Sequence, residues 1–269
     1  MVFAKVARMT TEFATAADGV RLGFERLAFE NQRSGEPVLL VHGFGSSREQ
    51  NWKSTGWYGS LTEAGHAVLA MDCRGHGQSD KPHDEASYGH ERMAEDVIAV
   101  MDAAGLGAVH LVGYSMGGFI GIRVLARFGQ RLASLSLGGV GEHYLTGRNV
   151  SSEGSRQVIA DALLTDDKSG ITDPRGRMFR DFADQPGKDR FALAACMRAM
   201  TPALSAHSLA GLQAPVLVVC GEKDDISGPP GPLADAFAHG VHATIPGRDH
   251  MSAVGDVRTR RAVLGFLAG

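Results

Sequence analysis

One serine, with a glycine two positions away on each side, has the surroundings that most clearly indicate a catalytic residue in this chain. The segment Gly113-Tyr114-Ser115-Met116-Gly117 follows the apolar stretch AVHLV and precedes a run with helical periodicity. A serine on a sharp turn from a strand into a helix has its hydroxyl exposed, where it can act as a nucleophile. Strand and helix approach closely at such a turn, so the positions two before and two after the serine must be small. The glycines there favour a catalytic Ser115 over an ordinary glycine-rich crossover turn.

A serine nucleophile needs a base, and the base needs an acid that orients it. Asp224 follows the apolar stretch PVLVVC, and His250 follows the stretch VHATI. Both are therefore expected at the carboxyl ends of strands, where open α/β sheets bind their ligands. His250 alone among the eleven histidines lies between the last expected strand and the final helix. The sequence predicts that Ser115, His250 and Asp224 form a catalytic triad.

The acid has two further candidates. Asp225 is adjacent to Asp224, and side chains one position apart cannot both point to the same imidazole. Glu142 follows the preceding expected strand, and some hydrolases take their acid from that position. The sequence favours Asp224 and leaves the other two open.

The reaction also requires two backbone N–H groups to stabilise the developing oxyanion. Met116, the residue after the nucleophile, supplies one of them. The other is expected in the segment His42-Gly43-Phe44-Gly45 after the stretch PVLLV, with Phe44 as the donor. The Phe44 ring would add an apolar wall to the pocket, and His42 is expected to hold this loop by a hydrogen bond.

Alternating strand and helix patterns surround these residues. The uninterrupted Val/Leu runs suit parallel strands that are covered on both faces, and Asp18-Gly19 indicates an antiparallel hairpin at the N-terminal edge. We therefore expect an α/β fold with a mostly parallel eight-stranded sheet and helices on both faces. The expected strands are 11–15, 20–29, 37–43, 67–72, 108–115, 131–139, 215–221 and 241–247, and the expected helices are 56–65, 90–105, 116–128, 231–239 and 254–267.

About 70 residues between Gly141 and Leu212 interrupt this alternation. They contain no clear strand pattern and three helical stretches, at 153–164, 175–184 and 188–200, which is too much for a plain loop. The sequence predicts a core over 1–140 and 212–269, and a helical cap over 141–211, inserted before the last two strands and above the carboxyl edge of the sheet.

The cap contains methionines and phenylalanines that could line an adaptable apolar pocket or bury the cap on the core. Burial is favoured for most of them. The candidates for substrate contact, from core and cap together, are Phe44, Tyr114, Met178, Phe179 and Phe182.

Five sequence blocks resemble those of the α/β-hydrolase superfamily, in its order and specifically in its capped serine esterase and C–C hydrolase branch. They are VLLVHGFGSS, MDCRGHGQSDKP, VHLVGYSMGG, PVLVVCGEKDDI and IPGRDHMSAV, and the resemblance covers roughly 20–141 and 212–268. It implies the fold of that family, with Ser115 as nucleophile, Asp224 as acid and His250 as base. It also implies an oxyanion hole formed by Phe44 and Met116.

The loop 72–79 resembles a structural loop that braces the site, so Asp72, Arg74 and His76 are given no catalytic role. Asp225 stands where the acid block of the family usually has a proline, which keeps the alternatives for the acid open. Ser115 excludes the relatives with a nucleophilic aspartate, the haloalkane dehalogenases and epoxide hydrolases, because their ester intermediate requires a carboxylate.

Composition narrows the class further. A net charge of −3 gives no electrostatic reason to expect a nucleic acid or an anionic membrane as partner. The apolar runs are too short to cross a bilayer, and Lys5 and Arg8 interrupt any apolar core of a signal peptide. The three cysteines are odd in number and widely spaced, which favours reduced thiols and a cytoplasmic location.

The sequence thus predicts a serine hydrolase, without cofactor or metal, that cleaves a small to medium carboxylic ester or thioester through an acyl-enzyme. A C–C bond hydrolase or lyase with the same triad stays open, as does a non-hydrolytic ligand-sensing protein. The expected partner is the small-molecule substrate, and the oligomeric state is not predicted.

Overall fold

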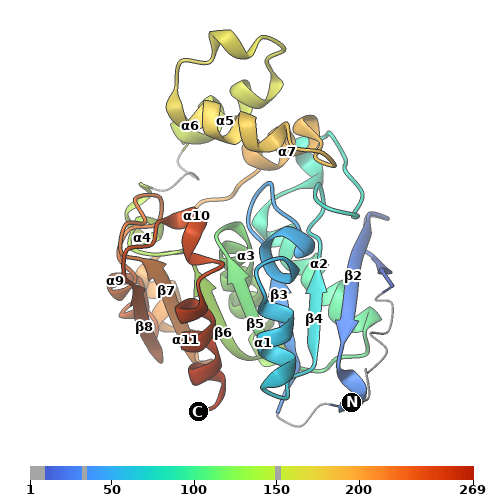
Figure 1. The fold of residues 1–269 in the computed structure, drawn as a ribbon, viewed down its shortest axis with the longest axis vertical. Coiled ribbons are helices and arrows are strands. Elements are labelled where there is room, and N and C mark those ends of the chain that lie inside the picture. Colours follow the sequence, from blue (N-terminus) through green and yellow to red (C-terminus); the bar gives the residue numbers. More distant parts are fainter. Residues whose placement is uncertain (1–9, 32–34, 149–152) are drawn as a thin grey trace, which may run out of the picture.

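Eight strands form one sheet in the computed structural model, which describes residues 10–31, 35–148 and 153–269. The order across the sheet is β1-β2-β4-β3-β5-β6-β7-β8 (Figure 1). The pairs β1–β2 and β2–β4 are antiparallel and the other pairs are parallel, which confirms the predicted architecture. The strands are β1 (Glu12–Thr15), β2 (Arg21–Leu27), β3 (Val38–Val41), β4 (Val68–Met71), β5 (Val109–Tyr114), β6 (Leu132–Gly138), β7 (Val216–Gly221) and β8 (Gly240–Ile245).

Helices cover both faces of this sheet. One apolar cluster joins the sheet to α2 (His90–Ala103), α3 (Met116–Phe128) and α9 (Gly231–Ala234). A second cluster, on the other face, includes residues of α1 (Trp57–Glu63) and α11 (Val257–Leu267). Short helices complete the core at α4 (His143–Thr146) and α10 (His250–Ala253), and a π-helical turn spans Glu49–Lys53.

Some helix boundaries differ from those predicted. The helix expected over 231–239 ends at Ala234, and the one expected over 254–267 begins at Val257 as α11, after a separate short helix, α10, that was not predicted. These two starts have a local cause: the Asp249 side chain accepts from Ser252 N and starts α10, and the Asp256 side chain accepts from Arg258 N and starts α11. Side chains at these positions satisfy the free amides of a new first turn, so each begins its own helix.

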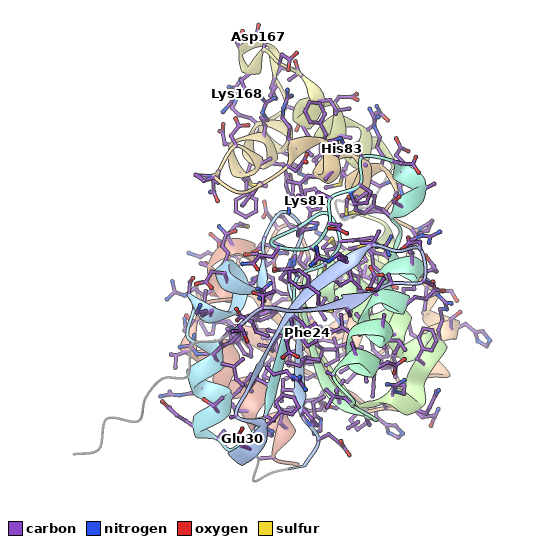
Figure 2. The ribbon with its side chains drawn as sticks, turned by 90° about the vertical axis from the view of Figure 1, so that its right-hand side faces the viewer. Phe24, Glu30, Lys81, His83, Asp167 and Lys168 are labelled. Carbon is purple, nitrogen blue, oxygen red and sulfur yellow. The ribbon has the colours of Figure 1, made fainter. Side chains whose placement is uncertain are left out.

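The predicted helical insertion lies between β6 and β7. Its three main helices, α5 (Glu153–Leu164), α6 (Pro174–Ala183) and α7 (Arg190–Arg198), match the expected stretches, and α8 (Ala206–Ala210) follows them. We call α5, α6 and α7 the helical layer. It lies beyond the carboxyl ends of the parallel strands (Figure 1), and Figure 2 shows Asp167 and Lys168 at its far end, opposite Glu30.

The helical layer also contacts a core loop. His83, in the segment after β4, lies against the layer (Figure 2), with its Nε2 2.9 Å from Asp189 Oδ2. Buried residues of α5 and α7, such as Leu163 and Met197, belong to the same apolar cluster as α2 and α3. The layer is therefore packed against the core.

Other expectations concern the chain as a whole. In the described ranges, no helix combines the length and apolar character that a membrane span requires. Cys73, Cys196 and Cys220 are buried free thiols. Lys5 and Arg8 lie outside the described residues.

Candidate active site

Ser115 occupies a strained turn between β5 and α3. Its backbone dihedrals are φ 52° and ψ −115°, a region that residues with a β-carbon rarely adopt. Ser115 N donates to Gly138 O at 2.7 Å, and Ser115 O accepts from the amides of Gly118 and Phe119. Strain of this kind is maintained where the surrounding structure imposes it, typically at functional sites.

The glycines around Ser115 are required by close packing. A β-carbon on Gly113 would lie 2.3 Å from Gly117 O, and one on Gly117 would lie 2.0 Å from Val41 O. Both contacts are to backbone atoms, which cannot move aside cheaply. Any larger residue would therefore push α3 away from β5 and β3 and displace the Ser115 hydroxyl.

Three side chains from separate loops lie within hydrogen-bond distance of one another. His250 Nε2 is 3.1 Å from Ser115 Oγ, and His250 Nδ1 is 2.9 Å from Asp224 Oδ2. Asp224 is buried, and its Oδ1 accepts from the amides of Ile226 and Ser227. An imidazole between a hydroxyl and a buried carboxylate can take the hydroxyl proton while the carboxylate stabilises the imidazolium that forms.

The two alternative acids lie elsewhere. Asp225 is exposed, and Glu142 precedes α4, where its amide donates to Pro229 O. Neither carboxylate is hydrogen-bonded to His250 in the part of the chain that the structure describes. The geometry therefore favours Asp224 as the acid.

Two residues that hold His250 were not predicted in that role. Ser227 Oγ donates to Gly139 O at 2.7 Å and lies 3.1 Å from His250 Nδ1. The Tyr114 hydroxyl donates to His250 O at 2.5 Å, so this predicted substrate contact also anchors the base. A hydroxyl residue three positions after the acid was the only sequence signal for Ser227.

The loop after β3 brings Phe44 toward the nucleophile. The amides on either side of Phe44 are held, since Gly43 N donates to Asn51 Oδ1 and Gly45 N donates to His76 Nε2, both at 2.9 Å. Met116 N is the first amide of α3, where no preceding turn of helix accepts a hydrogen bond. These two amides are the predicted oxyanion donors.

Buried histidines brace this loop. His42 Nε2 accepts from Cys73 N at 3.0 Å, and its Nδ1 lies 2.8 Å from Gly43 O. Burial lowers the pKa of His42 to about 4 and that of His76 to about 3. Both rings are therefore neutral at pH 7 and act as hydrogen-bonding supports, in the structural role expected for the loop 72–79. Asp72 in that loop is ion-paired with Arg48, and Arg74 is ion-paired with Asp96.

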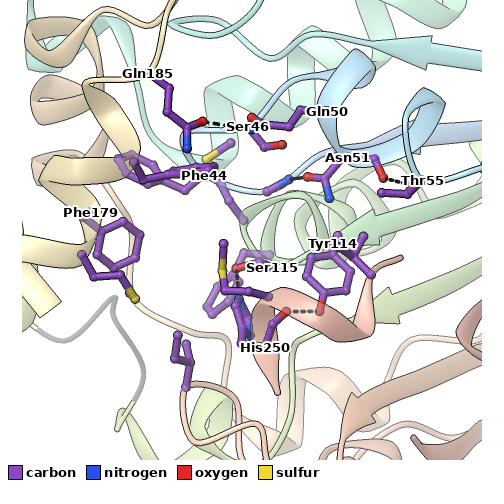
Figure 3. A pocket seen from close by; sticks show the side chains of 18 of the residues that line it. Phe44, Ser46, Gln50, Asn51, Thr55, Tyr114, Ser115, Phe179, Gln185 and His250 are labelled. Atoms are coloured by element: carbon purple, nitrogen blue, oxygen red, sulfur yellow. Dashed lines mark hydrogen bonds between the residues drawn. The ribbon is translucent and has the colours of Figure 1, made fainter. Parts of the chain in front are cut away.

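A cavity of about 490 Å³ opens above Ser115 and His250 (Figure 3). Polar groups at its edge include Gln50 and Gln185, whose amides join the core to the segment after α6 at 3.1 Å. Most of the other lining side chains are apolar: Phe44, Tyr114, Met116, Phe119, Met178, Phe179, Phe182, Met200, Ile226, Met251 and Val254.

All five predicted substrate contacts line this cavity. Phe179 points from α6 toward Phe44 (Figure 3), and their ring centroids are 5.7 Å apart. Met178 and Phe182 line it from the same helix. The expectation that most apolar residues of the insertion serve burial was thus too broad. It holds for Met197, but α6 presents its residues to the cavity because it lies directly above the site.

Comparisons with known proteins agree with the fold. The sequence model of one family, described as the alpha/beta hydrolase fold, matches residues 36–181, more than half of the chain. A hydrolase from Pseudomonas aeruginosa PA01 superposes with a TM-score of 0.77 at 24% identity, covering 98% of this chain and 100% of that one. A thermophilic esterase from Thermogutta terrifontis superposes with a TM-score of 0.69 at 25% identity, covering 97% and 98%.

A curated relative extends the similarity in sequence. The dihydrolipoyllysine-residue acetyltransferase component of an acetoin cleaving system from Pseudomonas putida is 31% identical over 207 residues, 71% of this chain and 53% of that protein. The chain spans between 37% and 53% of the length of the first curated relatives that it matches.

Proposed function

The chain belongs to the α/β-hydrolase family, and on that premise we propose that it is a serine hydrolase that cleaves a carboxylic ester or thioester. The observation that carries the proposal is the hydrogen-bonded series Asp224–His250–Ser115, which ends on a strained turn at the floor of an apolar cavity. Similarity to a solved esterase adds support.

The proposed reaction has two halves. His250 Nε2 takes the proton of the Ser115 hydroxyl as Oγ attacks the substrate carbonyl, and the amides of Phe44 and Met116 stabilise the oxyanion. Collapse breaks the carbonyl–oxygen (or carbonyl–sulfur) bond, and the imidazolium gives its proton to the leaving alcohol or thiol. Water then attacks the acyl-enzyme with His250 as base, which releases the acid and restores Ser115. No step requires a cofactor.

The helical layer is proposed to act as the cap of the site. Its α6 residues lie over the cavity, where they would exclude water from the oxyanion and limit the size of the acyl group. A cavity of about 490 Å³ suits small or medium substrates. The division into a core over 1–140 and 212–269 and a cap over 141–211 belongs to this proposal, as does a cytoplasmic location, which rests on the cysteine usage.

A C–C bond hydrolase or lyase with the same three residues is the alternative. It would need groups above the site that protonate a carbanion, and the residues of α6 that line the cavity include one acid, Asp181, which is exposed and paired with Lys168. This favours ester chemistry. A non-hydrolytic ligand-sensing protein would have the same site but would show no turnover of any ester.

Hydrolysis of 4-nitrophenyl esters from acetate to palmitate, beside one C–C substrate, tests the proposal. We expect turnover of the short and medium esters and labelling of Ser115 by a fluorophosphonate. Ser115→Ala should lower turnover by several orders of magnitude. Ser46→Ala is the matched control, because Ser46 lines the same cavity. Equal turnover in Ser115→Ala, or labelling of another residue, would contradict the proposed nucleophile.

A further inference from the structure

His90 is a buried polar residue in the wall of the otherwise apolar part of the cavity. It begins α2, is 2% exposed, and lines the cavity together with Phe119, Met116 and Met200. Neither the proposed reaction nor the bracing of the loop after β3 uses it. Phe119 follows Ser115 by four positions, which is a rise of about 6 Å along α3. The His90 ring, which lies against Phe119, is therefore in the wall about 6 Å along that helix from Ser115.

The orientation of the His90 ring is set by two contacts. The ring stacks on Phe119, with centroids 5.4 Å apart and planes inclined by 26°. Its Nδ1 lies 2.9 Å from Thr201 Oγ1, in the segment that follows α7. Thr201 also offers a backbone hydrogen-bond acceptor to the ring, which favours a proton on the nitrogen that faces Thr201, Nδ1.

His90 is also held neutral. Burial is the main cause that lowers its pKa to about 4, and the nearby charge of Arg123 acts in the same direction. In the tautomer that has its single proton on Nδ1, Nε2 carries a lone pair and can only accept a hydrogen bond.

Nε2 has no hydrogen-bond partner in the described structure. Four other buried polar atoms share this property there, Trp52 Nε1, Ser136 Oγ, Arg198 Nε and Arg260 Nε, but their residues do not line the cavity. An unsatisfied buried polar group costs about 1–3 kcal/mol of stability. His90 lines the cavity, so a ligand atom that reached Nε2 would remove that cost.

We propose that His90 Nε2 accepts a hydrogen bond from a hydroxyl or N–H group of the substrate. The inference rests on the proposed ester hydrolysis and narrows its substrate class to esters whose donor is carried on a group long enough to span the roughly 6 Å of α3 between Ser115 and Phe119. Met116 and Met200, beside His90 in the wall, have flexible side chains that can move to admit the donor. A bound substrate that lacks the donor leaves the nitrogen unpaired, whereas one with the donor satisfies it. This difference is how buried polar groups discriminate between substrates.

Three matched substrates test the proposal: the 4-nitrophenyl esters of 3-phenylpropanoate and of its 4-hydroxy and 4-methoxy derivatives. A second set carries the same three groups on a phenylethyl alcohol, in case the donor belongs to the leaving group. In one of the two sets, we expect wild-type kcat/KM to be about tenfold higher for the hydroxy compound than for the other two. The methoxy compound keeps the oxygen but lacks the donor.

His90→Phe keeps a ring against Phe119 and should abolish the preference, so that this variant has the same kcat/KM for the hydroxy compound as for the unsubstituted ester. His83→Phe, the same change at an exposed histidine, should keep the preference. If His90→Phe does not fold, Thr201→Val retains His90 but removes the Oγ1 contact of its Nδ1, and should weaken the preference. A wild type that hydrolyses all three compounds equally in both sets would overturn the inference and leave the proposed hydrolysis standing. A wild type that hydrolyses none would overturn both.

Discussion

Phe182 of α6 packs directly over Gly45, the residue after the proposed oxyanion donor Phe44. A β-carbon on Gly45 would lie 2.9 Å from two atoms of the Phe182 ring, and Gly45 has a φ of +69°. Lys188 Nζ also lies on that ring, 3.1 Å from its centroid, and burial lowers the pKa of Lys188 to about 8. The helical layer thus contacts the loop that holds Phe44, so changes in the layer are expected to affect catalysis as well as substrate choice.

Gly45→Ala should reduce kcat by about tenfold or more, because the new methyl group displaces the loop and the positive φ disfavours alanine by about 1–2 kcal/mol. Gly45→Ala combined with Phe182→Ala should recover part of the loss, since the second change removes the contact but not the backbone strain. Steady-state kinetics of the two single variants and the double variant measure this coupling. Strict additivity would show that the layer and the loop act independently.

Asp224→Asn should leave His250 poorly oriented and its imidazolium unsupported, with a loss in kcat approaching about 10⁴-fold. Asp225→Asn is the matched control, since Asp225 is exposed and one position away, and its effect should be less than about threefold. The comparison is made on one activated ester at saturating concentration. A larger effect at Asp225 would shift the acid by one residue, and no effect at either would point to Glu142.

The sequence was most informative where function follows an apolar strand. Ser115 and Asp224 each come after a continuous Val- or Leu-rich run, and His250 comes after the strand pattern VHATI. Their place at one edge of the sheet could therefore be predicted from the chain order alone. The same reasoning predicted the eight strands and the three helices of the insertion. Helix starts that depend on a single capping side chain, such as Asp256 before α11, were placed less well.

Other functional candidates depend on contacts that no local pattern encodes. Ser227 is hydrogen-bonded to Gly139, 88 positions away, and His90 is hydrogen-bonded to Thr201, 111 positions away. Which face of α6 meets the cavity depends on how the helical layer packs on the loop after β3. These relationships arise only when the chain is folded, because they join segments with no shared periodicity.

Acidification should destabilise the protein well before the carboxylates are protonated. His42, His76 and His90 have folded-state pKa values of about 4, 3 and 4, whereas histidine in an unfolded chain titrates near about 6.5. Between these values the unfolded state binds more protons, so the free energy of unfolding falls as the pH is lowered from about 6.5 toward 4. Urea unfolding at intervals from pH 7.5 to 4.5 should show this decline.

The variant His90→Phe removes one of the three buried sites and should make that decline shallower. A free energy of unfolding that is constant from pH 7 to pH 5 would mean that these rings accept protons in the folded state.

Ser227 offers a way to separate the orientation of the base from its proton transfer. Its hydroxyl proton is committed to Gly139 O, so its oxygen lone pairs face His250 Nδ1 beside the Asp224 carboxylate. The Nδ1 proton therefore has two acceptors, and loss of one should widen the range of ring orientations without removing the acid.

Ser227→Ala should lower kcat by about tenfold with little change in KM, because the misdirected ring affects proton transfer and not the apolar cavity that binds substrate. Ser227→Thr retains the hydroxyl and should restore most of the rate. A loss of thermal stability alone cannot lower kcat at constant KM and restore it in the threonine variant. Melting temperatures of both variants, compared with their kcat values, separate the two causes. If Ser227→Thr is as slow as Ser227→Ala, or if KM rises while kcat is kept, Ser227 does not position the base.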